Sequence, residues 1–465
     1  MPEIILPGTY ITVRDEGLIT AGRVSTGNIG IVGTAAKGPL NEVKIIGSFT
    51  EAREIFGDMD DIPASGSGEL TLVRAIQQIY NNGGRAVYAV RTGIATGTGA
   101  AKAAVVVLKN ANNDDVLKLE ARGVGSWGNQ IEVKISLPDG AAANSTERNC
   151  EIVEGARKER FNGSDLAGLA ARINGGSSLV TASVVATGNP APGTFSLGGG
   201  TDGVGTTPAA QGTHYAASLA LLENDIINIV LLAGQPDSAA AMTLALQGHL
   251  NTTTENKRER MAIVGCNGTT DENVIAAHSL ASDRIVFVAP GIRVGTEAMS
   301  GAYTAAAVAG LISSLPVQAS PTNKTLAIAG LKAEYTASKL EKLVQNRVLA
   351  VEKREGYRIV KGITTATNSA WHQITTRRIV DYAIYGVRSA CNPYIGKLNN
   401  ERVRGAMKAT LDAFLTRMVE DEALVSYELE VSATRAQEIA GECAVTMTIR
   451  PTFSIDFVRV TMYLG

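Results

Sequence analysis

Residues 226–234 of this 465-residue chain read IINIVLLAG, and two similar runs follow, RMAIVGCNG at 260–268 and RIVFVAPG at 284–291. Each run is short, almost continuously apolar and closed by glycine, which indicates a strand that is buried on both faces. Helices are expected between the runs, near 239–250 and 273–280. Strands that alternate with helices predict a mostly parallel sheet in an α/β domain.

The same pattern occurs earlier in the chain. IGIVG at 29–33 predicts a buried strand, a helix is expected at 70–81, and AVYAVR at 86–91 predicts the next strand. These elements make a βαβ unit, so we assign residues 26–92 and 205–352 to one α/β domain.

Two other regions differ in character from this domain. Residues 93–204 are rich in Gly, Ala, Ser and Asn around short strands at 116–121, 131–136 and 180–186, which predicts an inserted β-rich domain at the surface. Residues 1–25 contain one short β-type run and form an N-terminal arm.

Residues 353–465 are expected to form a C-terminal α+β domain. Long helices are predicted at 376–391 and 400–423, and strands within VSYELEVSA, CAVTMTIRPT and SIDFVRVTMYL. The second helix has one apolar face, because apolar residues recur at helical spacing at Val403, Met407, Leu411, Phe414, Leu415 and Met418.

The charge balance excludes some classes of partner. Lys and Arg number 43 and Asp and Glu 45, so the net charge is -2 and provides no long-range field to attract nucleic acid or an anionic membrane. No window reaches the roughly 18 apolar residues of a spanning helix, and the start MPEIILPGTYITV lacks the pattern of an export signal. We therefore expect a cytoplasmic product that binds no nucleic acid and does not insert directly into a membrane.

Three residues raise the alternative of a subtilisin-like serine hydrolase. Asp202, His214 and Ser300 occur in subtilisin order, and Ser300 opens the small-residue string SGAYTAAAVAG. However, Gln211 stands where the family has a first histidine, and the separation of Asp202 from His214 is far shorter than in that family. Asp202 also lies in a stretch that we interpret as a hinge, where nothing would orient the imidazole. We expect no catalytic residue.

No cofactor or metal site is expected either. Gly198, Gly200 and Gly203 match a dinucleotide fingerprint in spacing, but the turn residues that follow do not open a helix directly. Neither the four cysteines nor the four histidines are paired at ligand spacing, so we expect buried free thiols and no zinc site.

The two ends of the chain favour assembly with other copies. The arm carries a short β-type run at 10–14 with no hairpin partner, and the run at 455–465 is also rich in β-forming residues. Strands without partners gain hydrogen bonds when they join the sheet of another chain. Head-to-tail links of this kind grow into a helical array unless they close.

An ordered set of strings resembles the contractile tail sheath protein family. They are PGTYITV at 7–13, IGIVGTAAKGPLNEV at 29–43, GGTDG at 199–203, VAPG at 288–291, AAAVAGLISSLP at 305–316, the segment from 377 to 415, and the terminal strands. The resemblance covers nearly the whole chain apart from 93–204.

This resemblance implies a structural subunit that polymerises helically around a tail tube and contracts to drive the tube through a target cell envelope. It implies a subtilisin-like sheath domain without chemistry, an outer inserted domain, and a C-terminal domain next to the tube. Implied partners are further copies of the chain, the tail tube protein, and baseplate and tail terminator proteins, in the tail of a phage virion assembled in the host cytoplasm. The sheath of a bacteriocin-like tail or an injection system is an alternative within this class.

The resemblance also assigns residues to two kinds of contact. Inter-subunit strand exchange is expected at Tyr10, Ile11, Thr12, Val13, Phe457, Val458, Arg459, Val460, Thr461 and Met462. A surface that faces the tube is expected at Arg377, Arg378, Asp381 and Arg388, on the first C-terminal helix.

Overall fold

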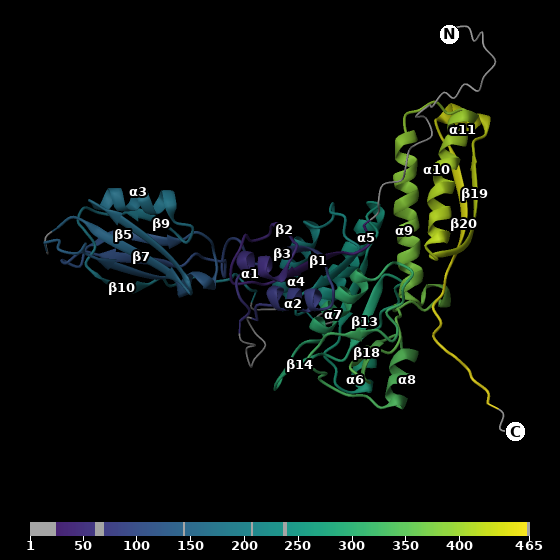
Figure 1. Ribbon diagram of the computed structural model, residues 1–465, viewed down its shortest axis with the longest axis horizontal. Helices are drawn as coiled ribbons and strands as arrows, with labels where there is room; N and C mark the ends of the chain where they lie inside the picture. Colours follow the sequence, from purple (N-terminus) through teal and green to yellow (C-terminus); the bar gives the residue numbers. More distant parts are fainter. Residues whose placement is uncertain (1–24, 61–68, 143–144, 206–207, 236–239, 463–465) are drawn as a thin grey trace, which may run out of the picture. The chain divides into compact units, whose positions relative to one another are not determined.

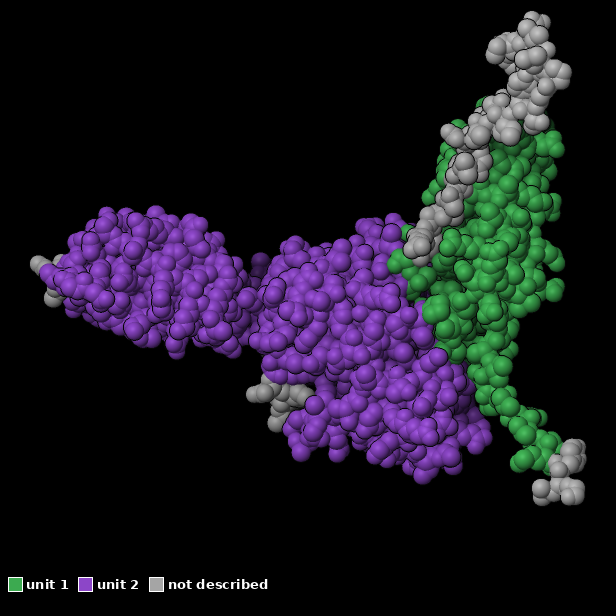
Figure 2. All heavy atoms as spheres, in the orientation of Figure 1, with its two compact units in different colours: residues 1–26, 316–320, 368–465 green, residues 27–315, 321–367 purple. Residues whose placement is uncertain are grey.

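The computed structural model describes residues 25–60, 69–142, 145–205, 208–235 and 240–462. Contacts between residues divide the chain into two compact units, which Figure 2 colours separately. The first, called the α/β unit here, comprises residues 27–315 and 321–367. The second, called the C-terminal unit, comprises residues 1–26, 316–320 and 368–465.

A nine-stranded, mostly parallel sheet is the centre of the α/β unit (Figure 1). Its strands, in spatial order, are β16 (Thr325–Leu326), β18 (Tyr357–Ile359), β17 (Leu349–Lys353), β13 (Ile285–Ala289), β12 (Met261–Gly265), β11 (Ile229–Leu232), β1 (Asn28–Gly33), β3 (Ala86–Arg91) and β2 (Val43–Ile46). Parallel pairing runs from β3 through β1, β11, β12 and β13 to β17. Every residue of β11, β12 and β13 is buried, which confirms the prediction from their apolar runs.

Helices cover both faces of this sheet. One face packs against α4 (Pro208–Ala220), α5 (Ala240–Glu255), α6 (Asp271–Ala276) and α8 (Ala337–Gln345), which share one core cluster with the strands. The helices α2 (Leu72–Asn81) and α7 (Gly301–Ser314) also contact β1 but contribute nothing to that cluster, so they cover the opposite face. A Cβ on Gly310 of α7 would lie 2.3 Å from the carbonyl oxygen of Ile79 on α2, so only glycine fits where these helices touch.

Two smaller features complete the main part of the unit. Helix α1 (Phe49–Phe56) packs against α2. A short hairpin of β14 (Arg293–Val294) and β15 (Glu297–Ala298) precedes α7.

The residues between β3 and α4 form a β-rich structure with its own core. One sheet has the order β4–β5–β9 and the other the order β10–β6–β7–β8. Their bounds are β4 (Val105–Lys109), β5 (Asp115–Ala121), β6 (Glu132–Ser136), β7 (Arg148–Glu154), β8 (Arg157–Gly163), β9 (Val180–Val184) and β10 (Gly193–Ser196). Helix α3 (Leu166–Gly176) packs against β8 and β9, one strand from each sheet, and closes one side of the core between them.

A buried arginine holds the base of this insertion. Arg91, at the end of β3, is fully buried and donates to the carbonyl oxygens of Gly38 (2.7 Å) and Val124 (2.8 Å) and to the carboxylate of Asp202 (3.4 Å). Asp202 also accepts from the backbone N–H of Ser126 at 2.7 Å. Burial lowers the pKa of Arg91 to about 10, an effect that the Asp202 carboxylate partly offsets. The stretch around Asp202 is therefore anchored, contrary to its interpretation as a hinge.

The C-terminal unit is an α+β structure of two long helices and one hairpin. α9 (Ile374–Cys391) packs against α10 (Glu401–Glu420), and β19 (Leu424–Ser432) pairs antiparallel with β20 (Ala444–Pro451). The short helix α11 (Arg435–Ala440) lies between the two strands in sequence. The predicted apolar face of α10 is confirmed, because five of its six residues are buried: Met407, Leu411, Phe414, Leu415 and Met418.

The boundary of the C-terminal part lies later than we expected. We placed it at 353, but β17 turns back into β18 at Glu355 and Gly356, both of which have positive φ. The two strands pair with each other and β17 pairs with β13, so they belong to the central sheet. Residues up to 367 therefore remain in the α/β unit.

The third C-terminal strand is also corrected. We expected it within 454–464, but residues 454–462 form no strand. A strand needs a neighbouring backbone to accept and donate its hydrogen bonds, and none pairs with this segment within the described ranges.

The hydrogen bonds and the ion pair of Arg91, called the Arg91 clamp here, are expected to stabilise the fold. Replacing Arg91 by Ala is expected to lower the free energy of unfolding by about 3–5 kcal/mol, because Asp202 and two carbonyl groups lose a buried cationic partner. The measurement is urea unfolding followed by tryptophan fluorescence. Arg53→Ala is the control, since the Arg53–Asp58 ion pair is exposed, and it should cost less than about 1 kcal/mol. Equal small losses in both variants would show that the clamp contributes little.

Candidate assembly surface

The three residues of the hydrolase alternative do not form a catalytic group. Ser300 is the N-cap of α7, and its Oγ accepts from the backbone N–H of Ala302 at 3.2 Å. Asp202 is held by Arg91 and Ser126, and His214 lies on α4. Within the described ranges no hydrogen bond joins two of the three side chains. A catalytic base must bind both its nucleophile and the carboxylate that orients it, so the geometry does not support this alternative.

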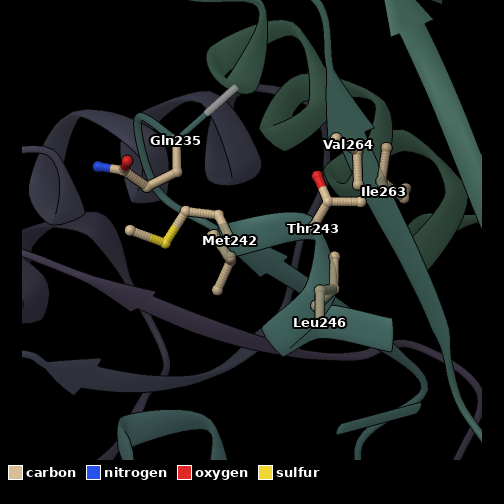
Figure 3. Close-up of a pocket in the computed structure, with 7 residues that line it drawn as sticks. Gln235, Met242, Thr243, Leu246, Ile263 and Val264 are labelled. Atoms are coloured by element: carbon tan, nitrogen blue, oxygen red, sulfur yellow. The ribbon is translucent and has the colours of Figure 1, made fainter. Parts of the chain in front are cut away.

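Metal and small-molecule sites are the next alternatives for the part of the chain that the structure describes. No group of three or more His, Cys, Asp or Glu residues there could hold a metal ion. The small pocket in Figure 3 is lined by residues without an acid, a base or a thiol: Leu232, Gln235, Met242, Thr243, Leu246, Ile263 and Val264. No helix of the described residues combines the length and apolarity needed to cross a membrane.

The cysteines are free thiols, as expected. Cys150 and Cys266 are buried, which the sequence predicted, whereas Cys391 is half-buried and Cys443 is exposed. The prediction of burial is therefore wrong for the last two, which lie at the end of α9 and just before β20.

The four residues expected to face the tail tube do not form one polar surface. The side chain of Arg377 is 6% exposed, pairs with Asp381 at 2.6 Å and lies over the ring of Trp371. Arg378 is also buried and donates to the carbonyl oxygens of Pro316 and Thr26. Burial lowers the pKa of Arg378 to about 10.

Arg377 and Arg378 therefore make buried contacts within the C-terminal unit, which the sequence did not indicate, and the assignment of these residues to a tube-facing surface stays a prediction. Arg388, nearer the end of α9, is half-buried. The charge pattern of the sequence did not reveal the burial, because the carbonyl partners of Arg378 lie at distant positions, before α9.

The segment after β20 in the C-terminal unit exposes large apolar side chains. Figure 1 shows it leaving the unit as an extended chain, in yellow. We call residues 452–462 the tail. Large apolar side chains of the tail are between 59% and 85% exposed: Phe453, Ile455, Phe457, Val458, Val460 and Met462. A contiguous apolar segment of this kind marks an interaction surface, because soluble proteins rarely leave one uncovered.

The tail contains all the C-terminal residues that the sequence assigned to strand exchange. Phe457, Val458, Arg459, Val460, Thr461 and Met462 are exposed. Phe453 and Ile455 were not among the residues assigned to strand exchange, although the alternation of apolar and polar residues begins at Phe453. The N-terminal candidates Tyr10, Ile11, Thr12 and Val13 lie outside the described residues.

The hairpin of the same unit offers a place for a strand to bind. β19 and β20 pair only with each other among the described strands, so each has one edge without a strand partner. One face of the hairpin packs on the helices through residues such as Leu429 and Met447. A two-stranded sheet is stabilised by further strands, and an open edge binds an extended segment through its backbone groups.

Comparison with known proteins gives the family. Two family models match adjacent parts of the chain, the phage tail sheath protein central domain at residues 209–365 and the phage tail sheath C-terminal domain at residues 366–465. The tail sheath protein of Bacillus phage SP01 is 24% identical over 238 residues, which are 48% of this chain and 40% of that protein. The chain thus matches less than half the length of this relative.

Solved structures show the same fold over nearly the whole chain. The sheath tail protein from Desulfitobacterium hafniense has 16% identity and a TM-score of 0.69, with 96% of this chain and all of that chain covered. The one from Listeria innocua has 14% identity and a TM-score of 0.63, covering 94% and 97%. The contracted sheath complex of the extracellular contractile injection system PVC has 11% identity and a TM-score of 0.58, covering 100% and 98%. With two adjacent sheath domain models spanning residues 209–465, the chain belongs to the phage tail sheath family.

Proposed function

We propose that this chain is the structural subunit of a contractile tail sheath. Subunits polymerise helically around a tail tube and contract to drive the tube through the envelope of a target cell. One observation supports the proposal beyond family membership: the C-terminal unit combines an exposed apolar tail with a hairpin whose two edges have no strand partner among the described residues. A chain with both features can link to further copies of itself in a head-to-tail series.

Strand exchange is the proposed link between subunits. The tail of one copy adds to the edge of β19 or β20 in another, and the N-terminal residues Tyr10, Ile11, Thr12 and Val13 provide a second link. Burial of the six apolar side chains of the tail is worth roughly 1.5–3 kcal/mol each, and ordering its eleven residues costs about 1–2 kcal/mol each. Because these effects are of similar size, the backbone hydrogen bonds and the second link decide whether the tail stays bound.

Contraction is proposed to be a rearrangement of rigid units around these links. Two packings of the same surfaces can differ by only a few kcal/mol, and many copies add their contributions. Sheath structures in the comparison include the contracted helical sheath of the anti-feeding prophage and its baseplate. By analogy, the partners of this chain are further copies of itself, a tail tube protein, and baseplate and terminator proteins, in the tail of a phage or phage-like particle assembled in the host cytoplasm.

The domain roles follow from the family and remain proposals. The C-terminal unit is placed next to the tube and the β-rich insertion on the outside. The main sheet is proposed to share the subtilisin architecture without its chemistry. In support, Ser300 opens a helix packed against the sheet, as a serine nucleophile would, but its hydroxyl caps that helix.

Removal of residues 454–465 is expected to abolish assembly. Negative-stain electron microscopy of the purified full chain should show long hollow cylinders, and the truncated chain should remain as small particles. Uniform small particles from both proteins at high concentration would remove the main support for the proposal.

A single substitution tests the tail without shortening it. Val460→Asp places a charge in the apolar row of the tail and should prevent cylinder formation, because burying an unpaired carboxylate is costly. Thr461→Asp is the matched control: neighbouring strand residues point to opposite faces, so this charge stays outside the apolar row and should be tolerated. Cylinders of Val460→Asp at the wild-type yield would argue against strand exchange.

Ser300→Ala separates the sheath from the hydrolase. The substitution removes only an N-cap and should lower stability by about 1 kcal/mol, with cylinder formation and any background peptidase signal unchanged. A purified wild-type protein with peptidase activity that disappears in Ser300→Ala would contradict the proposal.

A further inference from the structure

Gln373 binds the beginning of the tail through two hydrogen bonds of its side chain. Gln373 is the N-cap of α9, but its side chain makes no capping hydrogen bond. Instead, its Oε1 accepts from the backbone N–H of Ser454 at 3.3 Å and its Nε2 donates to Oδ2 of Asp456 at 3.3 Å. The hydroxyl of Ser454 donates to the other carboxylate oxygen of Asp456 at 3.1 Å. We call these three side chains and their bonds the tail clip.

The tail clip determines which face of the tail points outward. Ser454 and Asp456 alternate with Phe453, Ile455 and Phe457, so in an extended chain the two sets lie on opposite faces. The polar set faces Gln373. The apolar set is 59%, 82% and 79% exposed, respectively.

The alternation changes phase after Phe457. Apolar residues occupy 453, 455 and 457, and then 458, 460 and 462. A single regular strand would place these two rows on opposite faces. The tail therefore consists of a proximal segment, 452–457, which the clip fastens, and a distal segment, 458–462.

We propose that Gln373 is a positioning residue for assembly. By holding the polar face of the proximal segment against its own unit, it presents Phe453, Ile455 and Phe457 as a docking surface for a second copy of this chain. The same bonds set the direction in which the distal segment leaves the unit. This inference rests on the proposed strand exchange and adds a second contact, which that exchange does not require.

A second copy of the chain is the occupant that the structure favours. The outward row carries no charge, and the same chain contains a hairpin whose two edges pair with no further strand in the part of the chain that the structure describes. Both halves of a continuous contact, an apolar row and a sheet edge, are thus present in one sequence. An extended segment enters such a contact at lower entropic cost when its direction is already fixed.

Introducing a charge into the tail clip tests the role of Gln373. Gln373→Glu keeps the acceptor for Ser454 but places a carboxylate opposite Asp456, and the repulsion should open the clip. Cylinder growth, followed by light scattering, should slow about tenfold, as expected for the loss of one charge-assisted hydrogen bond. Adding Asp456→Asn supplies an amide donor to the new carboxylate and should restore the rate to within about threefold. Asp456→Asn alone leaves an acceptor for Gln373 and should assemble nearly as the wild type does.

A second readout reports directly on the clip. Trypsin cleavage after Arg459 in the unassembled chain should accelerate in Gln373→Glu and return to the wild-type rate in the double variant, with the melting temperature unchanged. If Gln373→Glu unfolds the C-terminal unit, Gln373→Ala takes its place and must show the same slow assembly and fast cleavage.

The outcomes separate this inference from the proposed function. Fast cleavage with a wild-type assembly rate would overturn the role of the clip, and so would a double variant that fails to recover. If Val460→Asp also assembles normally, the strand exchange itself is wrong. If Val460→Asp blocks assembly and Gln373→Glu does not, only the positioning role of Gln373 fails.

Discussion

Backbone hydrogen bonding is the constraint on which this molecule depends. A strand edge without a neighbour leaves its N–H and C=O groups to water, and a β-forming segment without a sheet has no regular structure. The C-terminal unit carries both conditions, in the edges of β19 and β20 and in the exposed tail. In the proposed strand exchange each is satisfied by the other between copies, since within the described residues the tail pairs with no strand. The incomplete sheet is therefore the proposed basis of assembly.

In the α/β unit, the backbone groups of the central strands are satisfied within the unit itself. Its central strands are paired on both sides and covered by helices on both faces, and the base of the insertion is held by the fully buried Arg91. A close-packed structure of this kind rearranges as a body and resists continuous deformation. Such a unit suits the proposed contraction, in which rigid parts move while the tails keep the subunits connected.

The sequence predicted the elements whose patterns are local. The continuous apolar runs gave β11, β12 and β13, and the helical spacing of Met407, Leu411 and Phe414 gave the buried face of α10. The sequence did not predict contacts between residues that lie far apart along the chain. Carbonyl groups far away in sequence accept the hydrogen bonds of the buried Arg378, so its charge alone did not indicate that the side chain is buried.

For the tail and the tail clip, too, the sequence predicted the local pattern but not the contacts. The alternation of the tail predicted a strand, but the described residues 454–462 form none, and the proposed strand partner is a second copy of the chain. The clip between Gln373 and Asp456 joins positions 83 residues apart, and no pattern in the sequence connects them.

The most direct test is a cryo-electron microscopy structure of the assembled cylinder. Strand exchange predicts continuous density for residues 458–462 paired as a strand along the edge of β19 or β20 in a neighbouring copy. Density in which the tail folds back onto its own unit, with both hairpin edges exposed to solvent, would contradict it.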